Sequence, residues 1–178
     1  MRVIDKRETV SRRDFLAASG TTALGAAVVV GAGTIVVPSQ GWGMEVKALK
    51  PESMATLIQM ARDIYPHDRI ADKYYAKAMK QHDEAAAGDA DTLKMLEDGV
   101  ADLDSRAGDG GYLGMGWEKD RVAVLQDIEG DGFFQAIRGS LVVGLYNQKA
   151  VWPLFGYEGA SAHKGGYVDR GFDDIDWV

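Results

Sequence analysis

The sequence predicts an all-α protein, a small helical bundle followed by an extended carboxy-terminal tail rich in glycine and aromatic residues. Between residues 51 and 149, apolar residues recur at intervals of three and four over five stretches, which is the period of an amphipathic helix. No stretch alternates apolar and polar residues between hairpin turns, so we expect no sheet. Residues 150–178 combine six large aromatic residues with interleaved glycines and have no helical period.

The first three helices are each marked by a start or stop signal. Pro51 suits the first position of a helix, and Pro66 ends that helix. A second helix is predicted over about residues 70–87. Asp89 or Asp91 is expected to cap a third helix. The apolar positions of this third helix follow a spacing typical of a packed seam: Leu93, Leu96, Val100 and Leu103.

The second half of the bundle is expected to begin after a flexible loop. Residues 107–116 contain five glycines and predict this loop. Two helices are predicted after it, over about residues 117–128 and 132–149. The turn between them resembles the opening of a calcium-binding loop. Its twelfth position is Arg138, where calcium requires a bidentate glutamate, so we expect a simple turn.

The amino-terminal segment, residues 1–42, predicts an export signal. Arg12 and Arg13 stand directly before an uncharged apolar run that opens with Phe15 and Leu16. This order resembles the S-R-R-x-F-L pattern of a twin-arginine translocation signal. A transmembrane anchor is the alternative, because the run is long enough to span a bilayer. No Ala-x-Ala site follows, so cleavage and a retained signal both stay open.

Composition excludes several classes of function. The chain has a net charge of −7, and its body, residues 43–178, carries 15 basic and 24 acidic residues. Such a body repels phosphate backbones, so we expect no nucleic-acid partner. The chain contains no cysteine, which excludes disulfides, thiolate-bound metals, iron–sulfur clusters and covalent c-type haem in this chain. Electron carriers, if present, must therefore lie on another chain.

No catalytic, cofactor or metal motif is complete, so we expect none of these sites. The glycine segment lacks the third glycine of a dinucleotide-binding loop, and Ser161 lacks the final glycine of a nucleophile elbow. The histidines stand singly and are expected to be solvated or interface residues: His67, His82 and His163. The aspartates near the carboxy terminus are expected to form a solvated end: Asp173, Asp174 and Asp176.

The last forty residues carry a resemblance to a known family. The matching segments are LYNQ at 145–148, VW at 151–152, FGYEG at 155–159, GGY at 165–167 and GFDD at 171–174. Together with the leader, the length and the helical body, they resemble the gluconate 2-dehydrogenase subunit 3 family. That family includes the small subunits of periplasmic flavin-dependent glucose, fructose, sorbitol and gluconate dehydrogenases.

The resemblance implies a non-catalytic subunit that carries no cofactor itself. The implied partner is a large subunit of the glucose–methanol–choline oxidoreductase type, which binds FAD and oxidises a sugar, sugar acid or alcohol. An iron–sulfur cluster, and haem c on a cytochrome c subunit, also belong on partner chains. The small subunit would supply the export signal to the twin-arginine translocase and help the large subunit mature. The implied location is the periplasm, with contact to the inner membrane through the complex or a retained signal.

The tail, residues 150–178, is expected to be the partner interface, and residues 43–149 the helical domain. The aromatic residues of the tail are too many for a solvated terminus, and aromatic anchors are enriched at interface cores. The six are Trp152, Phe155, Tyr157, Tyr167, Phe172 and Trp177. One alternative is that the tail packs on its own bundle. An alternative for the whole chain is a stand-alone exported binding protein or small enzyme.

Overall fold

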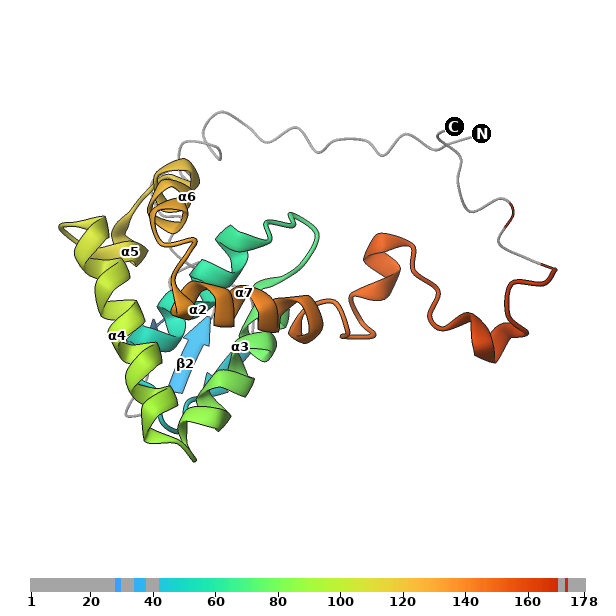
Figure 1. The fold of residues 1–178 in the computed structure, drawn as a ribbon, viewed down its shortest axis with the longest axis horizontal. Coiled ribbons are helices and arrows are strands. Elements are labelled where there is room, and N and C mark those ends of the chain that lie inside the picture. The colour runs from blue at the N-terminus through green and yellow to red at the C-terminus, as the bar shows by residue number, and fades with distance from the viewer. Residues whose placement is uncertain (1–27, 30–33, 38–41, 170–171, 173–178) are drawn as a thin grey trace.

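The computed structural model describes residues 28–29, 34–37, 42–169 and 172 of the chain (Figure 1). Within these residues, six α-helices confirm the predicted all-α fold. Their bounds are α2 Pro51–Ile64, α3 Asp72–Ala86, α4 Ala90–Ala107, α5 Gly111–Gly114, α6 Glu118–Asp127 and α7 Gly132–Gly144. The tail that follows contains two short 3-10 helices, η3 (Trp152–Phe155) and η4 (Ser161–Lys164).

Helix α2 forms the centre of the bundle. It contacts each of the other five helices of the described part. Its buried positions therefore extend around the whole helix rather than along one stripe, as expected for a helix enclosed on all sides. The apolar members of this core include Met54, Leu57, Ile58, Met60 and Ala61. Polar residues of α2 are buried as well, and these need partners inside the bundle.

The helix starts follow the signals in the sequence. Pro51 occupies the first turn of α2. Asp89, one of the two predicted caps, is the N-cap of α4, and its carboxylate accepts hydrogen bonds from the backbone amides of Asp91 at 3.2 Å and Thr92 at 3.3 Å. These bonds satisfy donors that have no partner within the helix.

Helix α7 is shorter than predicted, because it ends at Gly144 rather than at residue 149. The Gly144 carbonyl accepts a hydrogen bond from the Gln148 side chain at 2.8 Å, which takes the place of a helical amide. The backbone amide of Gln148 instead donates to the Leu145 carbonyl at 3.4 Å. Glycine also has low helix propensity, so the helix stops where its carbonyls find other donors.

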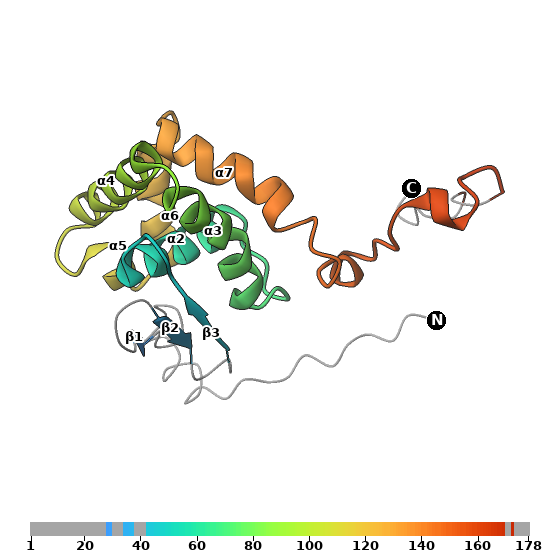
Figure 2. The same ribbon diagram turned by 90° about the horizontal axis from the view of Figure 1, so that it is seen from below.

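A small sheet contradicts the prediction that the chain contains none. Strands β1 (Val28–Val29), β2 (Thr34–Val37) and β3 (Trp42–Glu45) pair antiparallel in that order, with Ile35 opposite Met44. Figure 2 shows the sheet at one end of the bundle, and β2 contacts α2. β-branched valine and isoleucine favour strands even where apolar residues run together without alternation.

The glycine-rich segment is not the flexible loop that the sequence predicts. It contains α5, and its Tyr112 side chain is completely buried. Gly108, Gly110 and Gly111 adopt positive φ angles of 80°, 92° and 65°, a conformation that favours glycine. The Tyr112 backbone amide donates to the Asp104 carboxylate at 2.9 Å. The glycines therefore permit a tight turn that inserts an aromatic ring into the core.

The segment before α2 is fixed to α3 by one buried carboxylate. Asp83 accepts hydrogen bonds from the backbone amides of Lys47 at 2.8 Å, Ala48 at 2.9 Å and Leu49 at 3.0 Å. Burial alone would raise the pKa of Asp83, but the three amides outweigh it and hold the pKa below its usual value. Sequence reasoning did not single out this residue.

Candidate partner interface

The beginning of the tail is anchored on the bundle. Val151 is completely buried in the core. The Trp152 indole Nε1 donates to the Tyr146 carbonyl at 2.8 Å, and the Trp152 ring packs edge-on against Tyr157 with centroids 5.1 Å apart. Residues 151–157, the tail root, are therefore attached to the bundle through Val151, Trp152 and Phe155, while residues 153–157 stay exposed. The predicted alternative, that the tail packs on its own bundle, applies to these contacts.

An aromatic cluster receives the tail root. The Tyr146 ring lies at its centre, with centroid distances of 5.7 Å to Tyr65, 5.6 Å to His67 and 5.7 Å to Phe155. His67 also contacts Phe155 at 5.1 Å, and its Nε2 lies 2.7 Å from the Tyr146 hydroxyl. Edge-to-face packing of this kind stabilises aromatic pairs beyond the area that they bury.

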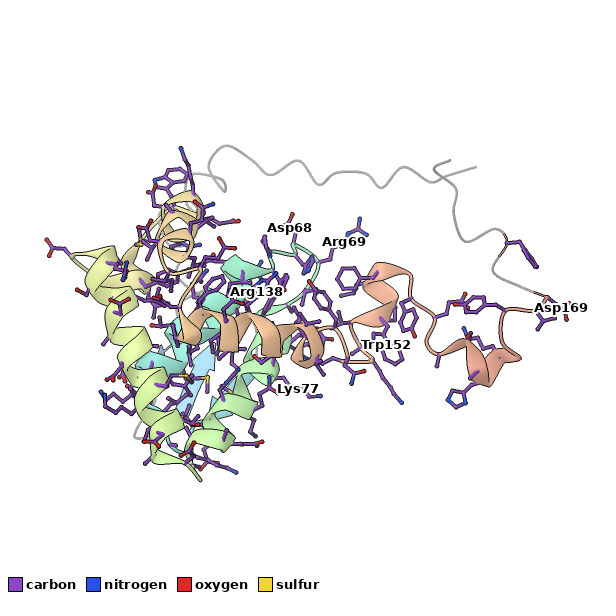
Figure 3. The ribbon with its side chains drawn as sticks, in the orientation of Figure 1. Asp68, Arg69, Lys77, Arg138, Trp152 and Asp169 are labelled. Atoms are coloured by element: carbon purple, nitrogen blue, oxygen red, sulfur yellow. The ribbon has the colours of Figure 1, made fainter. Side chains whose placement is uncertain are left out.

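The loop at residues 65–71, which carries part of this cluster, is held on both sides. Arg62 donates to the Asp72 carboxylate at 2.6 Å and to the Ile70 carbonyl at 3.2 Å. The Tyr75 hydroxyl donates to the Tyr65 carbonyl at 2.6 Å, and burial raises its pKa to about 12. Figure 3 shows Asp68 and Arg69 on the outside of this loop. A loop fixed in this way presents a preorganised surface.

The distal tail leaves the bundle and exposes large apolar side chains (Figures 1 and 2). Among the described residues, nine large hydrophobic side chains have substantial exposure. Three of them belong to the tail root (Leu154, Phe155 and Tyr157), and three belong to the distal tail, residues 158–169 and 172 (Tyr167, Val168 and Phe172). Tyr167 is 56% exposed and Phe172 is 79% exposed. A cluster of exposed apolar residues of this kind marks interaction sites on soluble proteins.

The predicted interface residues divide into two groups. The structure brings three of them together in the tail root and its cluster: Trp152, Phe155 and Tyr157. Two others are exposed: Tyr167 and Phe172. Trp177 lies outside the described residues, and so do the export-signal residues Arg12, Arg13, Phe15 and Leu16.

The histidines occupy three different environments. His67 belongs to the aromatic cluster. His82 is partly buried between α3 and α7, where burial lowers its pKa. The Ser140 hydroxyl donates a hydrogen bond to the Ile137 carbonyl at 2.8 Å. It therefore accepts a hydrogen bond from His82 Nε2, which lies 2.6 Å away. His163 is exposed on η4. Within the described part of the chain, no three His, Asp or Glu side chains gather as metal ligands would.

A buried polar network escaped sequence reasoning. The Asp63 carboxylate, on α2, accepts four hydrogen bonds: from Arg121 Nε at 2.7 Å, Arg121 Nη2 at 3.0 Å, the Tyr112 hydroxyl at 2.8 Å and Gln59 Nε2 at 3.0 Å. Arg121 Nη1 donates to the Met115 carbonyl at 2.8 Å. Burial and the neighbouring Asp63 carboxylate raise the pKa of Tyr112.

This network supports the fold rather than chemistry on a substrate. Both carboxylate oxygens of Asp63 have partners, and Asp63 and Arg121 are both buried. A bidentate pair between arginine and a carboxylate is a strong and geometrically specific contact. It connects α2, α5 and α6 at the core. A charged residue on the central helix was the signal that could have revealed it, because most positions of this helix are buried.

No helix of the described part is both long enough and apolar enough to span a bilayer. The described residues form a small helical protein with an aromatic tail that is anchored at its root and extends from the bundle. Comparisons with family models, with curated proteins and with solved structures gave no match to this chain.

Proposed function

We propose that this chain is the non-catalytic small subunit of an exported FAD-dependent dehydrogenase complex that oxidises a sugar, a sugar acid or an alcohol. In that complex it binds the flavoprotein large subunit, brings it to the twin-arginine translocase and assists its maturation. Catalysis and electron transfer take place on partner chains, which carry FAD and, where present, an iron–sulfur cluster and haem c.

The observation that carries this proposal is the exposed distal tail on an anchored root. Tyr167 and Phe172 are more than half exposed, although burying aromatic side chains is strongly favourable. The exposed area of such side chains can be buried on a partner, which would gain that free energy. The root contacts at Trp152 and Phe155 fix the point from which the tail departs.

Two further features support the escort role over catalysis by this chain. The buried titratable residues Asp63, Asp83 and Arg121 have their hydrogen-bond partners within the fold. The leader motif at Arg12 and Arg13 is that of a route that exports proteins already folded, often with a partner attached. A subunit that carries the leader for a second chain matches both features.

We expect the double substitution Arg12→Lys and Arg13→Lys to keep the complex in the cytoplasm. The twin-arginine motif depends on the guanidinium pair, so lysines of equal charge should not replace it. Dehydrogenase activity is measured in periplasmic and cytoplasmic fractions of the native organism. The matched control is Arg2→Lys with Arg7→Lys, which changes two arginines of the same leader outside the motif.

In the motif variant, periplasmic activity should fall to background while the control stays at the level of the unchanged protein. Normal periplasmic activity in the motif variant would remove the leader from the proposed role.

A further inference from the structure

A groove lies between α3 and the end of α7, close to the point where the tail leaves the bundle. Its volume is about 710 Å³. The residues that line it and carry the argument are Lys73, Lys77, Gly144, Gln148 and Lys149. Figure 3 shows Lys77 projecting from α3 on the side of the bundle from which the tail departs.

Three ammonium groups surround this groove. Lys73 and Lys77 are one helical turn apart on α3 and thus on the same face, and Lys149 follows the end of α7. All three residues are exposed, and none forms an ion pair with a carboxylate of the described residues. In a chain with a net charge of −7, this concentration of positive charge attracts an anionic group.

One polar atom at the groove lacks a partner. Gln148 is 9% exposed, and its Nε2 donates to the carbonyls of Tyr74 and Gly144, both at 2.8 Å. These two bonds fix the amide, and they leave the buried Oε1 without a hydrogen-bond donor among the described residues. A buried acceptor without a partner costs free energy. Because this oxygen is buried, the Gln148 side chain would have to shift before a donor from another chain could reach it.

The groove has a fixed floor and an apolar rim. At Gly144, an added Cβ would lie 2.9 Å from Gln81 Nε2 and 3.3 Å from the Ala78 Cβ, so α3 and α7 approach closely there. Val143, beside it, is 64% exposed. A cleft with an apolar edge and surrounding lysines suits a peptide segment, which supplies apolar side chains and carboxylates.

We propose that this groove receives an extended, carboxylate-bearing segment of the flavoprotein partner. The inference rests on the proposed function and deepens it by naming a second contact besides the aromatic tail. The groove ends at Lys149 and Ala150, and Val151 begins the tail root, so the two surfaces are continuous. The described part of the tail leads away from α3 (Figure 2).

The test measures the affinity of the full-length chain for the purified large subunit at low and at high salt. We expect Lys73→Glu with Lys77→Glu to weaken binding about 10-fold or more at low salt, because close charge pairs at interfaces are strongly coupled. High salt should reduce the difference in affinity between this variant and the unchanged protein, because salt screens exposed charges. The matched control, Lys94→Glu with Lys119→Glu, makes the same change in net charge on α4 and α6 and should bind like the unchanged protein.

Cross-linking of the unmutated complex provides a second measurement that does not depend on variants. A reagent that joins amines directly to carboxylates should connect Lys77 or Lys149 to an acidic segment of the large subunit. Links from these lysines to Asp173, Asp174 or Asp176 of the same chain, or to a second copy of it, would overturn the inference.

The binding measurement also separates the groove inference from the proposed function. If the unchanged protein binds the large subunit and the groove variant binds equally well, the groove inference is wrong and the proposed function stands. If the unchanged protein does not bind the large subunit at all, both are wrong.

Discussion

The substitution Arg121→Met is expected to lower the free energy of unfolding by about 3–5 kcal/mol, because it leaves the Asp63 carboxylate buried without its cation. Arg121 supplies two of the four hydrogen bonds to this carboxylate, at 2.7 and 3.0 Å. The Met115 carbonyl also loses its donor. Domains of this size are stable by only about 5–15 kcal/mol, so the loss is a large fraction of the total.

Denaturant unfolding, followed by helical circular dichroism, measures this effect. Arg106→Met is the matched control, because Arg106 makes a similar bond of 2.7 Å to Asp102, but on the exposed surface of α4. We expect the control to change stability by less than about 1 kcal/mol. Combining Arg121→Met with Asp63→Leu should restore part of the loss, since no uncompensated charge remains in the core. An Arg121→Met variant as stable as the control would show that the network does not support the fold.

Truncation after Gly159 is expected to abolish co-purification of the flavoprotein and to leave the bundle intact. This cut retains the buried Val151 and the Trp152 and Phe155 contacts of the tail root. It removes three predicted anchors: Tyr167, Phe172 and Trp177. Aromatic anchors at interfaces commonly contribute about 2 kcal/mol or more each, so losing three of them should reduce affinity below what survives purification.

The design of the truncation separates the interface from stability. A cut after Lys149 would also remove Val151 from the core, so it would weaken the fold and binding together. The matched control is Trp117→Ser, which deletes an aromatic side chain that is 68% exposed but lies far from the tail in sequence, before α6. The control should retain the partner. Retention of the partner after truncation, with unchanged circular dichroism, would contradict the role of the distal tail.

Local patterns in the sequence predicted the five longer helices but not α5. In the seam predicted at Leu93, Leu96, Val100 and Leu103, the last three residues are buried and Leu93 is partly buried against the core. Three- and four-residue spacing places these side chains on one face whatever that face contacts. Start signals such as Pro51 and Asp89 act within one turn of the chain, so they can be identified from neighbouring residues alone.

Contacts between distant residues could not be predicted in this way. Asp63 and Arg121 are 58 positions apart, and Asp83 reaches backbone amides 34 to 36 positions away. Nothing in the local sequence of either aspartate indicates its partner. The burial of Tyr112 depends likewise on the approach of α2 and α6, although its glycine-rich surroundings suggested only a loop.

The tail shows the same division between local and distant information. Its aromatic composition predicted burial of the rings, but composition does not say which rings find pockets on their own chain. The structure assigns the root to the bundle through Tyr146, which contacts both His67 and Phe155. The distal residues Tyr167 and Phe172 are exposed, and we propose that they become buried on the surface of the partner.

Affinity purification from the native organism tests the proposed role, in which this chain escorts a flavoprotein and holds no flavin itself. The full-length chain, carrying an affinity tag, is purified with whatever it binds and analysed by mass spectrometry and by its absorption spectrum. The same chain purified alone from a host without the partner is the control. We expect a flavin spectrum and a flavoprotein dehydrogenase subunit in the native preparation, and no chromophore in the control. A stoichiometric chromophore on the single chain, or a native preparation without a flavoprotein, would contradict the account.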